Sequence, residues 1–215
     1  MDAAAYHIPV LAPASLEGLG VGSKQGGVFV DATFGGGGHT RLMLDALNAD
    51  GHIYGMDQDS DVHENVPQDQ RFTLLPENFR YMRNFLRQEG VRYVDGILAD
   101  LGVSSHQFDT GSRGFSIRFE GPLDMRMNQS QPISAADVVG SYTVAELTRV
   151  FRQYGELKRP DKAAYAIESA RKDAPITRTN ELIAALSTLA PRGKENQYFA
   201  QVFQALRIEV NDELG

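Results

Sequence analysis

Four consecutive glycines at positions 35–38 are the strongest chemical signal in the sequence. They follow a short apolar run at 28–30 that ends on Asp31, and they lead into a segment with helical periodicity. Because glycine has no Cβ, such a turn lets backbone amides approach a ligand, and the start of the following helix favours negative or electron-rich groups. The dinucleotide fingerprint does not fit, since its third glycine would fall on Thr40 or Arg41, and no Walker lysine follows. The turn therefore predicts a ligand site of another kind.

Further candidate ligand contacts follow other strand-like runs. Asp57 comes 20 residues after Gly37, the spacing at which a strand-end carboxylate reaches ribose hydroxyls in nucleoside-binding α/β folds. Asp100 ends a later run, and the carboxyl ends of parallel strands share one edge of a sheet. Phe79 either stacks on a purine or packs in the core beside Met82. These positions predict a ligand that contains a nucleoside.

Alternating strand-like and helix-like segments position these residues. Four β-favouring runs are expected at 28–30, 52–56, 72–75 and 93–99, with helices at 41–47 and after a cap at Asn78. This alternation predicts an α/β fold with a parallel sheet. Residues 102–133 show no sustained period and are expected to form a long loop. The chain after Ser134 is expected to be helical, with candidates at 143–153, 160–172, 179–189 and 195–214.

The composition of the 215 residues narrows the class of protein. Hydrophobic residues make up 42% and charged residues 23%, as in soluble globular proteins. The absence of cysteine excludes disulfides, cysteine-ligated zinc and iron–sulfur clusters. No apolar run reaches the roughly 20 residues that span a bilayer, and the first residues lack the features of a secretory signal. We therefore expect a cytoplasmic protein. The five histidines do not have the spacing of metal ligands, so we expect no required metal.

Charge is distributed unevenly along the chain. Residues 1–104 hold 7 basic and 14 acidic side chains, whereas residues 105–215 hold 14 of each. Within 158–194 there are 8 basic and 4 acidic side chains, a local charge of +4. This asymmetry is typical either of a second unit with a basic face for nucleic acid or of solvated helix surfaces.

Six blocks of the sequence form a recognisable pattern. They are YHIPVL at 6–11, DATFGGGGHT at 31–40, DLGVSS at 100–105, RGFS at 113–116, GPLDMRM at 121–127 and FQALRIEVNDEL at 203–214. These blocks resemble the bacterial small-subunit ribosomal RNA cytosine-N4 methyltransferases of the MraW type, which use S-adenosylmethionine. The resemblance covers nearly the whole chain, and its blocks are specific to that family.

The resemblance implies a Rossmann-like methyltransferase domain carrying an inserted helical domain. We expect a cofactor-binding domain at 1–104, a helical substrate-recognition domain at 105–195 with the active-site loop 102–133, and a helix at 196–215 that returns to the first domain. Family members continue past this point into further strands, so we expect the chain to be a fragment whose sheet has four strands. Ala12-Pro13 stands where the family usually has acidic residues.

The resemblance also implies roles for individual residues. The implied cofactor contacts are Gly37, Gly38, His39, Asp57, Phe79, Asp100 and Gln107. The implied partner is 16S rRNA in the small ribosomal subunit, where one cytosine amine is the target; no membrane partner is expected, and a homodimer is left open.

Two sets of residues are candidates for the chemistry and for RNA contact. Asp100 is the predicted catalytic residue, because a carboxylate that accepts a hydrogen from the cytosine amine would favour its attack; a purely cofactor-binding Asp100 is the alternative. Arg113 and Phe115 are predicted to contact a phosphate and to stack on a base. Internal salt bridges and core burial are the alternative for both.

Two other classes of protein share part of this pattern. An NAD-dependent oxidoreductase would also place glycines and an acid after strands, although the missing third glycine counts against it. A non-catalytic RNA-binding module would explain the basic helices but not the cofactor-like first hundred residues.

Overall fold

The computed structural model describes residues 9–214, which fall into two units that meet between Gly102 and Val103. The boundary lies two residues before the expected one at position 104. The block at 6–11 is described only from Pro9 onward, so Tyr6, His7 and Ile8 lie outside the described residues.

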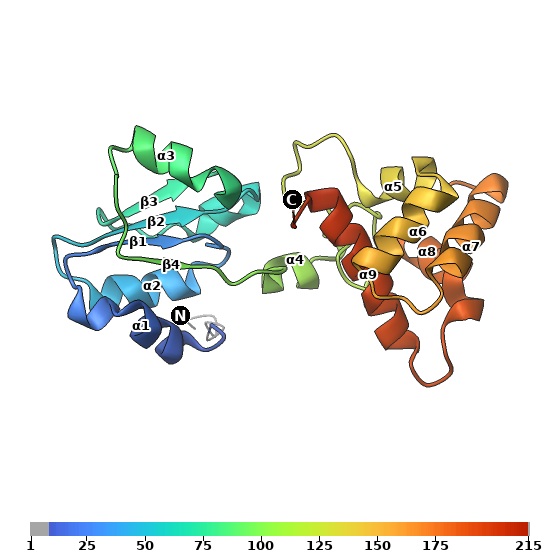
Figure 1. Ribbon diagram of the computed structural model, residues 1–215, viewed down its shortest axis with the longest axis horizontal. Coiled ribbons are helices and arrows are strands. Elements are labelled where there is room, and N and C mark those ends of the chain that lie inside the picture. Colours follow the sequence, from blue (N-terminus) through green and yellow to red (C-terminus); the bar gives the residue numbers. More distant parts are fainter. Residues whose placement is uncertain (1–8, 215) are drawn as a thin grey trace, which may run out of the picture. The chain divides into compact units, whose positions relative to one another are not determined.

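A four-stranded parallel sheet forms the centre of the first unit (Figure 1). Its strands are β1 (Val28–Asp31), β2 (His52–Met56), β3 (Phe72–Leu75) and β4 (Gly96–Leu98), in the order β3-β2-β1-β4. In register, Phe29 of β1 lies opposite Ile53 of β2 and Gly96 of β4. The predicted α/β class is confirmed. The fourth strand is shorter than the expected 93–99, and Tyr93 is exposed before it begins.

Helices cover both faces of this sheet. Helices α1 (Ala12–Leu19) and α2 (Gly38–Ala46) lie on one face, and α3 (Met82–Gln88) lies on the other (Figure 1). Short 3₁₀ helices span Val21–Ser23, Ser60–Asn65 and Phe79–Tyr81.

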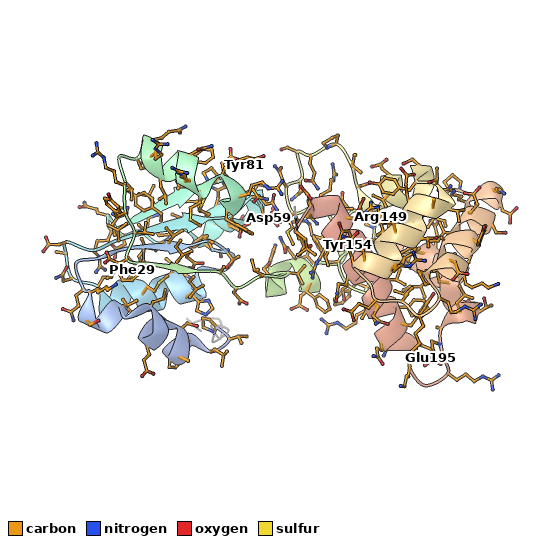
Figure 2. The ribbon with its side chains drawn as sticks, in the orientation of Figure 1. Phe29, Asp59, Tyr81, Arg149, Tyr154 and Glu195 are labelled. Atoms are coloured by element: carbon orange, nitrogen blue, oxygen red, sulfur yellow. The ribbon has the colours of Figure 1, made fainter. Side chains whose placement is uncertain are left out.

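Alternation along β1 explains the two layers of core. Successive side chains of a strand point to opposite faces, so Phe29 packs with Met43 of α2 whereas Val30 packs with Leu86 of α3. Figure 2 labels Phe29 within this unit. Both faces of the sheet are therefore apolar, as expected for a parallel sheet.

The second unit is helical. Its helices are α4 (Ser105–Asp109), α5 (Ala135–Ser141), α6 (Val144–Gln153), α7 (Pro160–Asp173), α8 (Thr179–Leu186) and α9 (Glu195–Asn211), with 3₁₀ helices at Gly111–Arg113 and Ser187–Leu189. The expected capping box at the start of α6 is confirmed, since Thr143 Oγ1 accepts from the Glu146 amide and Glu146 bonds back.

The expectation of a loop without secondary structure at 102–133 is wrong in its first part. Ser104 and Gln107 form a capping box that starts α4, and the chain then turns through the 3₁₀ helix Gly111–Arg113. A second capping box, Ser134 with Asp137, starts α5, which the sequence interpretation did not single out.

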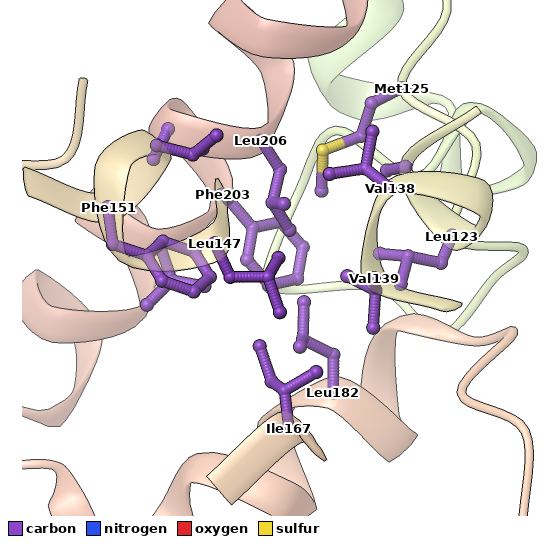
Figure 3. Close-up of a cluster of buried hydrophobic side chains, with 14 of the residues drawn as sticks. Leu123, Met125, Val138, Val139, Leu147, Phe151, Ile167, Leu182, Phe203 and Leu206 are labelled. Atoms are coloured by element: carbon purple, nitrogen blue, oxygen red, sulfur yellow. The ribbon is translucent and has the colours of Figure 1, made fainter. Parts of the chain in front are cut away.

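By its contacts helix α9 falls in the second unit, and the return of 196–215 to the first domain stays a prediction. Its apolar side chains Phe203 and Leu206 are buried in the same cluster as Leu147 of α6 and Val138 of α5 (Figure 3). Asn211 is buried as well, and its side-chain amide donates to the Met125 carbonyl at 2.7 Å. The helix is therefore held by apolar packing and by a buried polar contact.

No helix of the described part of the chain combines the length and the apolar character needed to cross a membrane. Among the same residues, no group of three or more His, Asp or Glu side chains is placed to hold a metal ion.

Candidate functional site

The carboxyl ends of β1, β2 and β4 are joined by backbone hydrogen bonds just past the strands. The Ala32 amide donates to the Leu98 carbonyl at 2.8 Å, and the Phe34 amide donates to the Met56 carbonyl at 2.9 Å. The glycine turn that follows β1 therefore leaves the sheet beside the segments that carry Asp57 and Asp100.

The glycine turn needs glycine at two positions for identifiable reasons. Gly37 has a φ of 70° and forms the N-cap of α2, and a Cβ there would lie 2.9 Å from the Phe34 ring. A Cβ on Gly38 would lie 2.7 Å from Pro9 Cγ. By contrast, a Cβ on Gly36 would meet nothing within 4 Å. The turn is thus tightly packed on one side and open at Gly36.

Asp57 is bound directly to this turn. Its Oδ2 accepts from the Gly35 amide at 2.9 Å, and its Oδ1 accepts from the Asp59 amide at 3.0 Å. The carboxylate also accepts a hydrogen bond from the Gln58 amide, and because a carboxylate can accept about four hydrogen bonds, it retains acceptor capacity for about one more. Burial raises the pKa of Asp57 above its usual value, and hydrogen bonds from the Asp59, Gly35 and Gln58 amides oppose that shift. Asp59 follows in the same segment (Figure 2).

Two side chains hold the carbonyl groups of the turn, and sequence reasoning missed both. Arg41 Nη1 donates to the Gly36 carbonyl at 2.6 Å and Nη2 donates to the Asn65 carbonyl at 2.9 Å. The side-chain amide of Asn65 donates to the Gly35 carbonyl at 3.1 Å. Helix α2 and the 3₁₀ helix Ser60–Asn65 therefore fix the turn from two sides. Such a contact between distant residues leaves no local pattern in the sequence.

Asp31, at the end of β1, stabilises the start of α2 through hydrogen bonds. Its Oδ2 accepts from Thr40 Oγ1 at 2.8 Å and its Oδ1 accepts from the Thr33 amide at 3.2 Å. Burial raises the pKa of Asp31, while the Thr40 and Thr33 bonds oppose the increase. The only sequence feature that could have indicated these hydrogen bonds of Asp31 is its position just before the four glycines.

His39 is buried in the first turn of α2. Its Nε2 lies 3.1 Å from the Val10 carbonyl and so donates to it. The imidazole therefore connects α2 to the segment before α1. A ligand at the glycine turn would contact the backbone of His39 rather than its side chain.

Asp100 and Phe79 reach the same sheet edge from two other segments. The Asp100 amide donates to Thr33 Oγ1 at 2.7 Å, and its side chain is exposed. Phe79 follows Asn78, whose side chain accepts from the Arg80 amide and donates to Gln58, the neighbour of Asp57, at 3.3 Å. Phe79 is 37% exposed and is not in the α3-side core cluster that contains Leu86. The structure thus brings the turn, Asp57, Asp100 and Phe79 to one edge of the first unit.

Gln107, Arg113 and Phe115 lie in the second unit, and all three are buried there. The side chain of Gln107 accepts from the Ser104 amide at 3.1 Å within the α4 capping box.

Arg113 and Phe115, the predicted substrate contacts, interact with residues of their own unit. Arg113 Nη2 donates to the carbonyls of Arg126 and Met127 at 2.9 and 3.3 Å, and Arg113 Cζ lies 5.8 Å from the centre of the Phe115 ring. Phe115 is 6% exposed and belongs to the apolar core of the unit. This placement matches the alternative of internal packing, because the guanidinium serves backbone carbonyls and the ring faces no solvent.

Comparison with known proteins places the chain in a family. The model of the MraW methylase family matches residues 4–215. A protein of Cytophaga hutchinsonii named ribosomal RNA small subunit methyltransferase H is 51% identical over 211 residues, which are 97% of this chain and 70% of that protein. A protein of the same name from Phocaeicola vulgatus is 50% identical over 209 residues, covering 97% of this chain and 68% of that protein. The chain therefore belongs to the MraW methylase family.

Proposed function

We propose that this chain binds S-adenosylmethionine at the sheet edge of its first unit and methylates the N4 amine of a cytosine in 16S rRNA of the small ribosomal subunit. Membership of a methylase family calls for a methyl donor, and the relatives' names refer to small-subunit ribosomal RNA. The observation that carries the proposal is the 2.9 Å bond between the Gly35 amide and Asp57 Oδ2. This hydrogen bond holds the carboxylate that would bind the ribose beside the glycine turn, whose backbone a ligand could approach.

The residues at this edge fit the donor. Asp57 has acceptor capacity left for a ribose hydroxyl, and the backbone of Gly37, Gly38 and His39 would contact the methionine part and sulfonium end. The exposed Phe79 ring would lie against the adenine, and Asp100 would complete the site. Family membership does not favour the NAD-dependent oxidoreductase or the non-catalytic RNA-binding module.

The chemistry asks the protein to position two groups and to exclude water. When bound, S-adenosylmethionine supplies a methyl group on a sulfonium, which an amine can displace in line. The N4 lone pair of cytosine is delocalised into the ring, so the amine is a poor nucleophile while it is planar. The exposed Asp100 carboxylate, held by the bond from its amide to Thr33, would accept a hydrogen bond from N4 and favour the pyramidal amine. The target base must leave its stack to reach this position.

Methyl incorporation into isolated small subunits tests the proposal. With labelled S-adenosylmethionine, the chain should transfer label to 16S rRNA, and nucleoside mass spectrometry should identify N4-methylcytosine. Asp100→Asn should lower turnover or cofactor affinity; full turnover with unchanged affinity would exclude both roles of Asp100. Because ribosomal subunits are assembled in the bacterial cytoplasm, we propose that this is where the chain acts.

A further inference from the structure

Three exposed side chains of the second unit form a cluster that the proposed cofactor site does not use. Arg118 Cζ lies 5.0 Å from the centre of the Phe108 ring and 5.5 Å from the centre of the Phe119 ring. The two rings are 36% and 41% exposed, and the Arg118 side chain is 57% exposed. We name this group the Phe108–Arg118–Phe119 cluster.

The cluster is not part of the apolar core of its unit, since neither ring is among the residues of that core. Its backbone is nevertheless fixed. The Phe119 carbonyl accepts from Thr179 Oγ1 at 3.0 Å, and the Phe108 amide donates to the Ser104 carbonyl at 3.0 Å. Exposed aromatic rings on a fixed backbone lose little freedom when a partner binds.

The charge of the cluster is available to an anion. Arg118 Nη2 lies 2.8 Å from Asp109 Oδ1, and the Asp109 side chain is 65% exposed. Exposed ion pairs of this kind contribute little, and a phosphate can replace the carboxylate because arginine binds both in the same geometry. The ion pair of Arg149 differs from that of Arg118, because its partner Glu209 is only 11% exposed and is less accessible to replacement by a phosphate.

We propose that the Phe108–Arg118–Phe119 cluster is a stacking platform for unpaired bases of single-stranded RNA, with Arg118 contacting a backbone phosphate. The proposal rests on the proposed function, which supplies RNA as the partner. Aromatic faces and planar guanidinium groups stack on any base. Bases inside an A-form duplex are already stacked on each other and present no free faces, so the platform selects unpaired RNA.

Fluorescence anisotropy with a short labelled oligoribonucleotide, single-stranded or annealed to its complement, tests this surface. Phe119→Ala should weaken single-strand binding about tenfold, and Phe119→Trp should restore it. Arg118→Gln should weaken binding and lower its salt dependence. Arg178→Gln is the matched control: this arginine is also exposed and paired with one carboxylate, Glu120 at 3.0 Å, but it makes no ring contact among residues 9–214. The affinity of Arg178→Gln for the single strand should stay within about threefold of the wild-type affinity.

Three results would overturn the platform. They are unchanged single-strand affinity in Phe119→Ala, equal losses in Arg118→Gln and Arg178→Gln, and a wild type that binds no single strand or binds the duplex as tightly. Thermal denaturation verifies that each variant is folded. Calorimetry with S-adenosylmethionine separates the two proposals. Absence of cofactor binding in the wild type counts against the proposed function, whereas intact cofactor binding with unchanged RNA affinity in Phe119→Ala overturns the platform alone.

Discussion

The two neighbouring glycines Gly36 and Gly37 should respond very differently to alanine. At Gly37 the φ of 70° disfavours any Cβ, which would also lie 2.9 Å from Phe34 Cε2 and 3.0 Å from Arg41 Nη1. The left-handed conformation costs about 1–2 kcal/mol, and overpacking against a buried ring costs about 1–3 kcal/mol. Gly37→Ala should therefore destabilise the first unit by about 2–5 kcal/mol.

Circular dichroism during thermal denaturation measures this difference. For a unit of this size each kcal/mol shifts the midpoint by about 4–8 °C, so Gly37→Ala should lower the first unit's midpoint by 10 °C or more, as an order of magnitude. Gly36→Ala is the control, because a Cβ there meets nothing within 4 Å, and its midpoint should stay near that of the wild type. Equal midpoints for the two variants would refute this description of the turn.

Three further predictions concern the support of the two units. Arg41→Ala removes the bonds to the Gly36 and Asn65 carbonyls and should weaken S-adenosylmethionine binding about thirtyfold in calorimetry, since the two bonds contribute about 1 kcal/mol each. The exposed Arg87→Ala should leave affinity unchanged. Because the pKa of Asp31 is raised in the folded protein, its protonation stabilises the fold. This contribution is complete at a pH below 3.8, the pKa of the unfolded chain, and is lost as the pH rises through the pKa of the folded protein. Stability of Asp31→Asn in urea should consequently fall less steeply over that interval, and a slope equal to wild type would contradict the assignment. Gly114→Ala places a Cβ against the Pro122 carbonyl at a φ of 74° and should destabilise the second unit by about 3 kcal/mol in denaturation, whereas Gly140→Ala, with open space in α5, should not destabilise it.

Local patterns predicted much of the first unit. Strands β2 and β3 begin and end where the apolar runs do, because turn-forming residues bound these runs on both sides. Asp57 was identified from its spacing to the glycines, and the structure bonds it to Gly35. Both features depend on residues close in sequence or on the regular geometry of a parallel sheet.

Helices α4 and α5 had a local signal that was overlooked. Each starts at a serine followed three residues later by Gln107 or Asp137, and each of these pairs forms a capping box. Short helices of five and seven residues carry too few turns for apolar periodicity to reveal them.

The roles of Arg113 and Arg41 depended on distant backbone carbonyls. Arg113 donates to carbonyls 13 and 14 residues away, and Arg41 reaches the Asn65 carbonyl 24 residues away. A carbonyl group is present at every position, so no residue type marks it as an acceptor. An arginine that serves the fold therefore looks the same in sequence as one that binds phosphate.

Calorimetric titration of the wild type and of Asp57→Ala, each with S-adenosylmethionine and with NAD, measures whether the edge that carries Asp57 is the binding site of the methyl donor. We expect the wild type to bind S-adenosylmethionine and not NAD, and Asp57→Ala to bind S-adenosylmethionine at least tenfold more weakly. Binding of NAD by the wild type, or equal affinity of the two proteins for S-adenosylmethionine, would overturn the assignment of this site.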